Sequence, residues 1–367
     1  MIIPELLDMI LDFLHDSPAD LRRCCLVNSD WFPAARFHLF AYLGIESVDA
    51  ANRLAHMHRQ APHLLGRVNH LAFAVRPPAV ASGVYNTLAR LRPSFSCLER
   101  LSVFTLPSDE GLPALRDLIA LPSLTHVMVL PTKDVRLMFS LFARRKASLR
   151  TLEVRSRFYG HQPDLDDEAE ALSSVPKVPV RRLVVENIPP RMDFGPFDLT
   201  DLKHLSVADF HECDSFHGML EIIGGELTSL DIAIFFTGRP ESETFGRVAL
   251  NLPRLTDLTL HIDNPSMLSG LPRFLPPLLS DGPVKQLTIC TSRDCAPTKA
   301  DLEQFEHRTV WDRIDEAIHE KPAVRFKLSV KLMIGGRLST EDSVSELRAC
   351  LPRLETAGRF SLGVLRQ

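Results

Sequence analysis

The 367-residue sequence lacks several features that mark common classes of protein. Its net charge is −4, so it has no basic excess of the kind that nucleic-acid-binding domains carry. No apolar run approaches the ~18–20 residues that cross a bilayer, and acidic residues interrupt the apolar N-terminal segment, which excludes a secretory signal. The seven cysteines are scattered, without the spacing of a disulfide framework. We therefore expect an intracellular protein, cytoplasmic or nuclear or both, that binds neither nucleic acid nor a membrane.

Motifs that carry chemistry are also scarce. The sequence contains no Gly-x-Ser-x-Gly, no His-Glu-x-x-His and no phosphate-binding loop. His211, Cys213 and His217 are three metal-ligand types without a second pair, and four residues separate Cys290 from Cys295, where a zinc or redox motif has two. We expect no metal, no cofactor and no catalytic residue, and a hydrolase is the most remote of the hypotheses.

The first 44 residues have the pattern of three short helices. In the first, five apolar residues follow Pro4 on one broad face of a helix. The second begins near Ser17, where Asp20 completes a capping pattern, and extends to about Val27. The third begins near Ser29 or Asp30 and extends toward Leu43.

These helices contain more apolar surface than they can bury among themselves. Units below ~40 residues rarely fold on their own core. We expect Phe37 and Phe40 to pack on the following domain, near Leu54 and Leu71, and the remaining apolar surface to bind a partner protein. In the alternative interpretation, the helices only cap the domain that follows.

The same segment resembles an F-box. The resemblance covers about 44 residues and depends on order and spacing, with isoleucine in place of the usual leucine before the proline. It implies binding to a Skp-type adaptor and, through it, to a cullin. The positions that match are Ile3, Pro4, Leu7, Ile10, Leu14, Leu21, Val27 and Trp31.

A repeat occupies residues 45–367. Its clearest copies, at 121–130 and 252–262, each begin with Leu-Pro-x-Leu and continue with alternating apolar residues. The first core residues of the strands are spaced by 22 to 31 residues, close to the leucine-rich-repeat period of ~20–29. These core positions are Leu71, Leu101, Val127, Leu152, Leu183, Leu205, Leu230, Leu258 and Leu287.

Helix-like segments lie between several of these strands. They occupy residues 47–62, 111–121, 134–145 and 339–351, and a long amphipathic helix at 301–320 precedes a strand that would place Leu328 after Leu287. Strand and helix in alternation predict a parallel sheet, and a common period favours a solenoid over a doubly wound nucleotide-binding fold. The expected fold is α/β: a three-helix F-box at 1–44, then a leucine-rich-repeat-like solenoid at 45–367 with an atypical C-terminal capping unit. That closing unit is also similar to the ends of fungal F-box proteins.

Alternate residues of each strand should face away from the core, on the concave side of such a solenoid. With Leu258, Leu260 and Ile262 facing inward, the residue between each pair faces out. The candidate substrate contacts chosen by this rule are Phe104, Met128, Glu153, Arg155, Glu186, Asp231, Phe235 and His261.

The resemblance and the repeat together predict a substrate-recognition subunit of an SCF (Skp–cullin–F-box) ubiquitin ligase. Such a chain does no chemistry itself and holds an unknown protein substrate near the enzyme that does. The alternative is a repeat scaffold that binds a protein without any role in ubiquitin transfer.

Overall fold

The structure is a computed structural model, and the chain divides into two compact units. Unit 1 comprises Met1–Pro179 and Gly195–Phe197, and unit 2 comprises Val180–Phe194 and Asp198–Gln367. The expected boundary at residue 44 therefore lies inside unit 1. The residues that the structure describes are 3–14, 17–75, 78–106, 109–130, 140–142, 144–155, 177–186, 197–208, 220, 223–234, 252–262, 271, 275, 283–292, 305–321, 323–332, 348 and 351–366.

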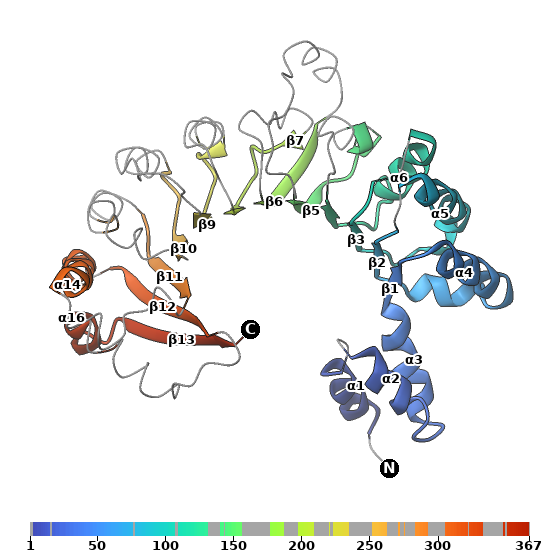
Figure 1. The fold of residues 1–367 in the computed structure, drawn as a ribbon, viewed down its shortest axis with the longest axis horizontal. Coiled ribbons are helices and arrows are strands. Elements are labelled where there is room, and N and C mark those ends of the chain that lie inside the picture. Colours follow the sequence, from blue (N-terminus) through green and yellow to red (C-terminus); the bar gives the residue numbers. More distant parts are fainter. Residues whose placement is uncertain are drawn as a thin grey trace, which may run out of the picture. The chain divides into compact units, whose positions relative to one another are not determined.

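Unit 1 starts with three helices and continues with strands that alternate with helices (Figure 1). Its helices are α1 (Pro4–Asp12), α2 (Pro18–Cys24), α3 (Trp31–Ala41), α4 (Val48–Gln60), α5 (Pro78–Leu91) and α6 (Leu112–Ile119). Short 3-10 helices lie at η1 (Pro62–Arg67), η2 (Arg92–Ser94) and η3 (Asp109–Gly111). Its strands are β1 (Tyr42–Ile45), β2 (His70–Phe73), β3 (Arg100–Val103), β4 (His126–Val129) and β5 (Leu149–Arg155).

The described part of unit 2 consists mainly of strands, most of them longer than those of unit 1. Two strands cross the unit boundary in the sequence, β6 (Val178–Glu186) and the short β7 (Phe197–Asp198). The strands that follow are β8 (His204–Ala208), β9 (Ser229–Ile234), β10 (Asp257–Ile262), β11 (Gln286–Ser292), β12 (Arg325–Leu332) and β13 (Phe360–Arg366). Its described helices are α14 (Phe305–His319) and α16 (Pro352–Thr356).

Strands pair in sequence order and in parallel within each unit. The order is β1-β2-β3-β4-β5 in unit 1 and β6-β8-β9-β10-β11-β12-β13 in unit 2. Leu71, Leu101, Val127 and Leu152 are register partners in unit 1, as are Leu183, Leu205, Leu230, Leu258 and Leu287 in unit 2. All nine are at most 2% exposed, and each contributes about 1.5–3 kcal/mol through burial. The predicted α/β fold with parallel strands is confirmed.

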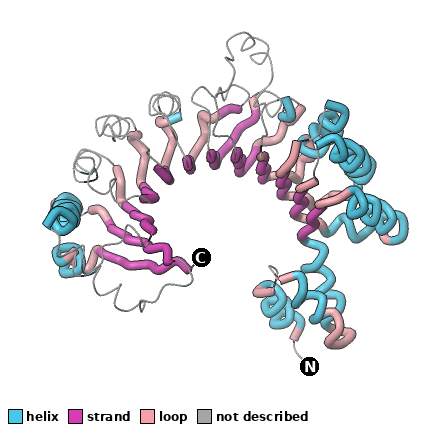
Figure 2. Tube along the Cα trace, in the orientation of Figure 1, coloured by secondary structure: helices cyan, strands magenta, loops and turns pink. Residues whose placement is uncertain are grey.

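Helices cover one face of the sheet in unit 1. Figures 1 and 2 show α4, α5 and α6 on one side of β1–β4, and no described helix on the other side. Because side chains alternate across a strand, every second strand residue lies on this uncovered side, which we call the open face. Strand β10 of unit 2 has the same alternation, with Leu258, Leu260 and Ile262 buried and Thr259 and His261 partly exposed.

The helices form where their sequences cap and bury them. Ser47 accepts a hydrogen bond from the backbone N–H of Ala50 at 3.1 Å, which starts α4, and the buried Ala51 and Leu54 hold its inner face against the sheet. Most of α6 is buried as well, because its leucines recur at helical spacing. Two of the predicted helical segments, 47–62 and 111–121, are confirmed as α4 and α6. Of the segment 134–145 the structure describes 140–142, which are helical, and 144–145, and the segment 339–351 lies almost wholly outside the described residues.

Threonine hydroxyls join consecutive repeats immediately before their strands. Thr125 Oγ1 donates to the carbonyl of Glu99 at 3.3 Å, Thr228 Oγ1 to that of Lys203 at 3.0 Å, and Thr256 Oγ1 to that of Thr228 at 3.1 Å. In each case the backbone N–H of the same threonine binds the same carbonyl. Each threonine therefore fixes its own repeat to one carbonyl of the preceding repeat.

A buried arginine fastens the repeat that ends with α6. Arg145 is 1% exposed, and its guanidinium donates to the backbone carbonyls of Ile119, Leu121, Leu124 and Ser148 at 2.5 to 3.3 Å. Burial lowers its pKa to about 10, still well above neutral, so the side chain keeps its charge. Carbonyls at the end of a helix have no partner within it, and Arg145 satisfies that of Ile119, the last residue of α6, together with three carbonyls of the turns that follow.

Unit 2 closes with two similar contacts. Asp315 of α14 is buried, and its carboxylate accepts the backbone N–H groups of Arg353 and Leu354, both at 3.0 Å, at the start of α16. Arg359 donates to carbonyls at the end of α14, including that of His319 at 2.9 Å. The long helix predicted at 301–320 is confirmed as α14, and its Trp311 side chain is buried.

Two details differ from the sequence prediction. The third helix ends at Ala41, and Leu43 belongs to strand β1, whose four residues are too few to show a clear alternation. In the last long repeat, Leu287 pairs with Phe326 and not with Leu328, which is the partner of Ile289. The predicted register was wrong by two residues, because the aromatic Phe326 takes the core position where earlier repeats have leucine or valine.

Candidate protein-binding surfaces

The first three helices of unit 1 form a small core of their own. Leu7, Leu11, Leu21, Cys24 and Ala35 are buried in it. The partly buried apolar residues that pack against this core are Leu14, Cys25, Trp31, Ala34 and Leu39. Burial, together with the neighbouring Asp20 carboxylate, raises the pKa of the Cys24 thiol, so this cysteine is a packing residue and not an activated nucleophile.

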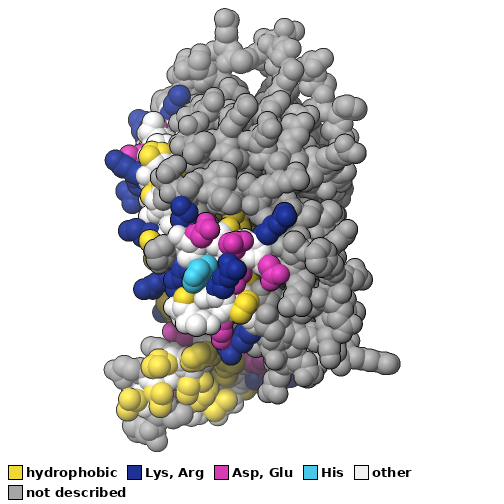
Figure 3. Space-filling model, turned by 90° about the vertical axis from the view of Figure 1, so that its left-hand side faces the viewer, with side chains coloured by type: hydrophobic (Ala, Val, Ile, Leu, Met, Phe, Trp, Pro, Cys, Tyr) yellow, Lys and Arg dark blue, Asp and Glu magenta, His cyan; other side chains and the backbone are white. Residues whose placement is uncertain are grey.

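A second apolar surface of these helices is exposed. In the part of the chain that the structure describes, every large apolar side chain classed as exposed lies between residues 3 and 42. Phe13 is 84% exposed and Leu26 is 86% exposed. The full set is Ile3, Leu6, Met9, Phe13, Leu26, Val27, Phe32, Phe37 and Tyr42. Figure 3 shows yellow apolar side chains gathered at the bottom of the view.

Helix α1 has an apolar stripe on each of two faces. Leu7 and Leu11, four residues apart, face the small core, while Leu6, Met9 and Phe13, at spacings of three and four, remain exposed. A helix that is apolar on both sides requires two partners. The three-helix core supplies one of them, and the exposed stripe has none within the described residues.

Helix α3 adds aromatic side chains to this surface. The Arg36 guanidinium lies between Phe32 and Phe40, 5.6 Å and 5.8 Å from their ring centroids. Arg67 of η1 lies 5.7 Å from the ring centroid of Phe37. Phe37 thus contacts the first repeat through Arg67, but it stays about half exposed, where a buried ring was expected.

The residues that match the F-box pattern divide by burial. Ile3 and Val27 are exposed, and Ile10, Leu14 and Trp31 are partly buried. Leu7 and Leu21 are buried in the three-helix core, so in this structure they hold the helices together and leave contact with a partner to their neighbours. Pro4 is the first residue of α1. Sequence analysis missed Leu6, Met9, Phe13, Leu26 and Phe32, although the spacing of the first three was visible.

Helix starts in this region also differ from expectation. Asn28 Oδ1, and not Ser29 or Asp30, accepts the backbone N–H groups of Asp30 and Trp31, at 2.8 and 3.0 Å. Ser17 does not cap α2 through its hydroxyl, which donates instead to Asp20 at 2.6 Å. That hydrogen bond lowers the pKa of Asp20, and the nearby Arg23 lowers it further.

The open face of unit 1 carries four of the candidate substrate contacts. Phe104 and Met128 are partly exposed, and Met128 is the register partner of Glu153. Glu153 and Arg155 form an ion pair at 3.2 Å. A partly exposed phenylalanine and methionine beside an ion pair can contact a peptide, and the prediction that they do so remains open.

A row of polar side chains precedes these residues on the same face. Tyr42, His70, Arg100 and His126 are register partners across β1–β4. His70 Nε2 lies 2.9 Å from Ser102 Oγ, and the His70 ring meets that of Tyr42 edge to face. Burial lowers the pKa of both histidines, and Arg100 between them lowers it further, so both rings are neutral at pH 7.

Unit 2 carries the other candidate contacts. Asp231 Oδ1 lies 2.8 Å from His261 Nε2, and these residues occupy neighbouring strands β9 and β10. Glu186 is partly exposed at the end of β6. Phe235 lies outside the described residues. Sequence analysis chose Asp231 and His261 by strand alternation alone, and their pairing could not be foreseen from it.

Other candidate sites are few. His211, Cys213, His217 and Cys295 lie outside the described residues, and Cys290 is buried in β11. Within the described residues, no group of three or more His, Cys, Asp or Glu side chains is arranged to hold a metal ion. The same residues include no helix with the length and apolar character that crossing a membrane requires.

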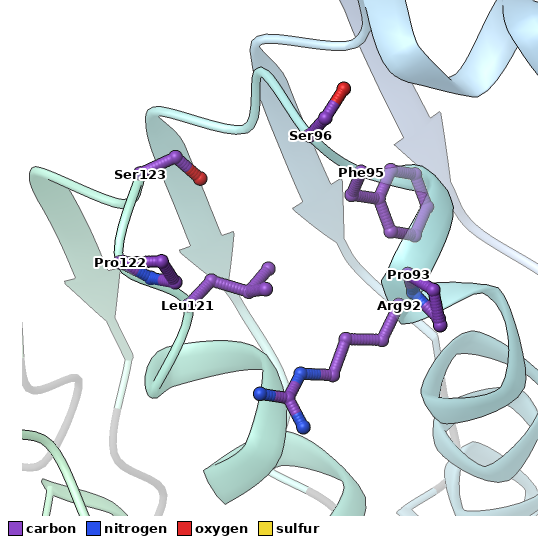
Figure 4. A pocket seen from close by; sticks show the side chains of 7 residues that line it. All are labelled: Arg92, Pro93, Phe95, Ser96, Leu121, Pro122 and Ser123. Carbon is purple, nitrogen blue, oxygen red and sulfur yellow. The ribbon is translucent and has the colours of Figure 1, made fainter.

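A shallow pocket lies between two repeats of unit 1 (Figure 4). Its volume is about 370 Å³, and the turns that precede β3 and β4 form its walls. Figure 4 shows the Arg92 side chain reaching across it toward Leu121. The lining residues are Arg92, Pro93, Phe95, Ser96, Leu121, Pro122 and Ser123.

Comparison with known proteins gives no family assignment. No model of a known protein family matches the chain, and no curated protein matches it. The functional argument therefore depends on the surfaces described above.

Proposed function

We propose that the three N-terminal helices bind a Skp-type adaptor and that the repeats hold a protein substrate, so that the chain is a substrate-recognition subunit of an SCF ubiquitin ligase. The observation that carries the proposal is the apolar surface of α1–α3. All the exposed large apolar side chains of the described residues lie between residues 3 and 42, in these helices, the turns beside them and the first residue of β1. An exposed apolar patch of this kind marks a protein-binding site.

The surface suits a helical partner. Leu6, Met9 and Phe13 form a stripe on α1 of the type that one helix presents to another. Leu26 and Val27, just after α2, and Phe32, at the start of α3, add further exposed apolar side chains. The F-box resemblance of residues 3–31 supplies the identity of the partner, which composition and burial alone do not provide.

The repeats supply the second binding surface. In unit 1 the open face carries the partly exposed Phe104 and Met128, and in unit 2 strands β9 and β10 carry the partly exposed pair formed by Asp231 and His261. In this role the chain contributes proximity alone, because holding a target lysine near the ubiquitin carrier raises its effective concentration. Transfer of ubiquitin belongs to other subunits.

Adaptor binding can be tested with exposed residues only. The double variant Phe13→Ser and Leu26→Ser removes two side chains that are more than four-fifths exposed, so the helices should keep their stability within about 0.5 kcal/mol. We expect it to lower the affinity for recombinant adaptor by about tenfold or more, since apolar anchors dominate interfaces. The matched control is Ala19→Ser with Arg22→Ser, which changes two exposed positions of α2 and should bind as the wild type does.

Leu14→Ala and Trp31→Ala are less informative variants, because both side chains pack against the three-helix core and their loss would loosen it. Co-purification, with a thermal melt of each variant, is the measurement. Undiminished binding by the Phe13 and Leu26 variant, or no binding by the wild type, would remove the ligase role. The alternative, a repeat scaffold without a role in ubiquitin transfer, would then be favoured.

A further inference from the structure

Positive charge gathers in unit 2 where the strands begin. Arg181, Lys203 and Lys285 occupy one row across neighbouring strands, since the backbone N–H of Lys203 binds the carbonyl of Arg181 and the carbonyl of Lys285 accepts the N–H of Arg325. Arg182 and Arg325 lie in the next row, in register with His204, Ser229, Asp257 and Gln286. Figure 3 shows dark-blue Lys and Arg side chains along the left-hand margin of the view.

Four of these cations, together with Lys327, are exposed and lack an acidic partner. Among the described residues no carboxylate pairs with any of them, although the chain as a whole has net charge −4. Lys327 belongs to the set because it lies two residues after Arg325, on the same side of β12. The five are Arg181, Arg182, Lys285, Arg325 and Lys327.

The cations form two groups with a stretch of balanced charge between them. Its two cations, Lys203 and Arg254, both pair with Glu226, the first at 2.5 Å. Asp257 adds a second carboxylate in the same stretch, in the row of Arg182 and Arg325. His204 adds no charge at pH 7, because burial and the adjacent Arg182 lower its pKa.

We propose that this edge of unit 2, where the strands begin, binds an extended peptide with two acidic clusters separated by neutral or basic residues. One cluster would meet Arg181 and Arg182, and the other would meet Lys285, Arg325 and Lys327. Charge complementarity to the two cationic groups supports this occupant, because each group offers several donors to carboxylates.

The carboxylates between the two cationic groups disfavour a nucleic acid. A polynucleotide carries a uniform row of phosphates, some of which would face Glu226 and Asp257. Proteins that hold single strands also stack bases on aromatic side chains, and the described residues of these two rows include no Phe, Tyr or Trp. A peptide can place a lysine or a glycine over these carboxylates.

The strand spacing fixes the spacing of the acidic clusters. Four inter-strand steps separate β6 from β11, and at about 4.8 Å each they span about 19 Å. An extended chain covers about 3.3 Å per residue, so the clusters should lie about six residues apart. This proposal deepens the proposed function, because the peptide would belong to the substrate. The binding assay contains no adaptor, so its outcome is independent of the adaptor test.

The experiment is fluorescence anisotropy with the full chain. The probe is a labelled peptide with two pairs of glutamates about six residues apart, joined by glycine, serine and one lysine. The comparison probes are a peptide of the same composition with all glutamates contiguous, and single-stranded oligothymidine of similar length. Affinity is measured at ionic strengths of about 0.05 and 0.15 M, because screening weakens exposed charge contacts.

The variant reverses three cations, Arg182→Glu, Lys285→Glu and Arg325→Glu. Its control, Arg53→Glu, Arg59→Glu and Arg313→Glu, makes the same change in net charge at exposed helical positions away from these rows. Thermal melts establish that both variants are folded.

We expect the paired-glutamate peptide to bind more tightly than either comparison probe. The edge variant should lose about tenfold or more in affinity, and the control should stay within about twofold, because net charge is the same in both. Equal losses in the two variants would overturn the proposal in favour of non-specific attraction. Tighter binding of oligothymidine would overturn it in favour of a nucleic-acid site, and equal binding of both peptides would refute the spacing.

Discussion

Replacing Arg145 with methionine should destabilise unit 1 far more than any change at its exposed neighbour. The guanidinium donates four hydrogen bonds to backbone carbonyls, two of them, at Ile119 and Leu124, at 2.5 Å. Hydrogen bonds from a charged donor contribute about 1.5–3 kcal/mol each, or about 6–12 kcal/mol for four. Burial lowers the pKa of Arg145 to about 10, which corresponds to a desolvation cost of about 3 kcal/mol.

Water that reaches the freed carbonyls lowers the cost of losing the arginine, and so does the packing of the new methionine. The expected net loss is about 3–5 kcal/mol in the free energy of unfolding, typical of a buried charge network that loses one member. Urea denaturation followed by circular dichroism measures the loss. Hydrogen exchange of peptides that cover α6 and β4 shows whether it is local to the carbonyls that Arg145 binds.

The adjacent Arg144 provides the control. Its ion pair with Asp117 spans 3.3 Å between side chains that are 63% and 39% exposed, so Arg144→Met should cost under about 1 kcal/mol. If Arg145→Met cost no more than Arg144→Met, the carbonyls would not depend on the guanidinium, and its role in joining the repeats would be refuted.

Two further predictions concern acid stability and the C-terminal repeat. Burial holds the pKa of His70 and His126 below 6.5, so the unfolded chain takes up protons first and the stability of the fold should decrease as the pH drops below about 6.5. In thermal melts, a variant with glutamine at both positions should lose less stability over this pH range than the wild type. An equal loss in the two proteins would contradict the assignment. Asp315→Ala frees two N–H groups of α16, one buried and one partly buried, and should cost about 1–3 kcal/mol in urea denaturation. Asp312→Ala, at an exposed position on the same helix, should cost under about 0.5 kcal/mol.

The repeats could be predicted because their core residues recur at a regular period. Leu101, Val127 and Leu152 lie on adjacent parallel strands as the spacing required. The register failed only at Phe326, where the aromatic side chain fills the leucine position and shifts the pattern by two residues. Strand β1 was missed because four residues directly after a helix carry no periodic signal.

The N-terminal surface was harder to predict. Spacing shows that Leu6 and Leu7 both lie on apolar stripes of α1, but it does not show which stripe meets the core. That choice depends on how α2 and α3 pack, so the buried Leu7 and Leu21 were grouped with the exposed Ile3 and Val27. The contact of Asp231 with His261 was hidden for a similar reason, because it joins residues 30 positions apart in the sequence.

The threonines that precede β4, β9 and β10 limit where the chain between two strands can change in length. Each hydroxyl reaches a single carbonyl of the preceding repeat, so one residue added between Thr256 and Leu258 would move the bond or the core leucine out of place. Spacings between core residues vary from 22 to 31, so the length of chain between one strand and the next differs while these bonds recur. We therefore expect residues added between strands, away from these threonines, to be tolerated while the stack of repeats is preserved.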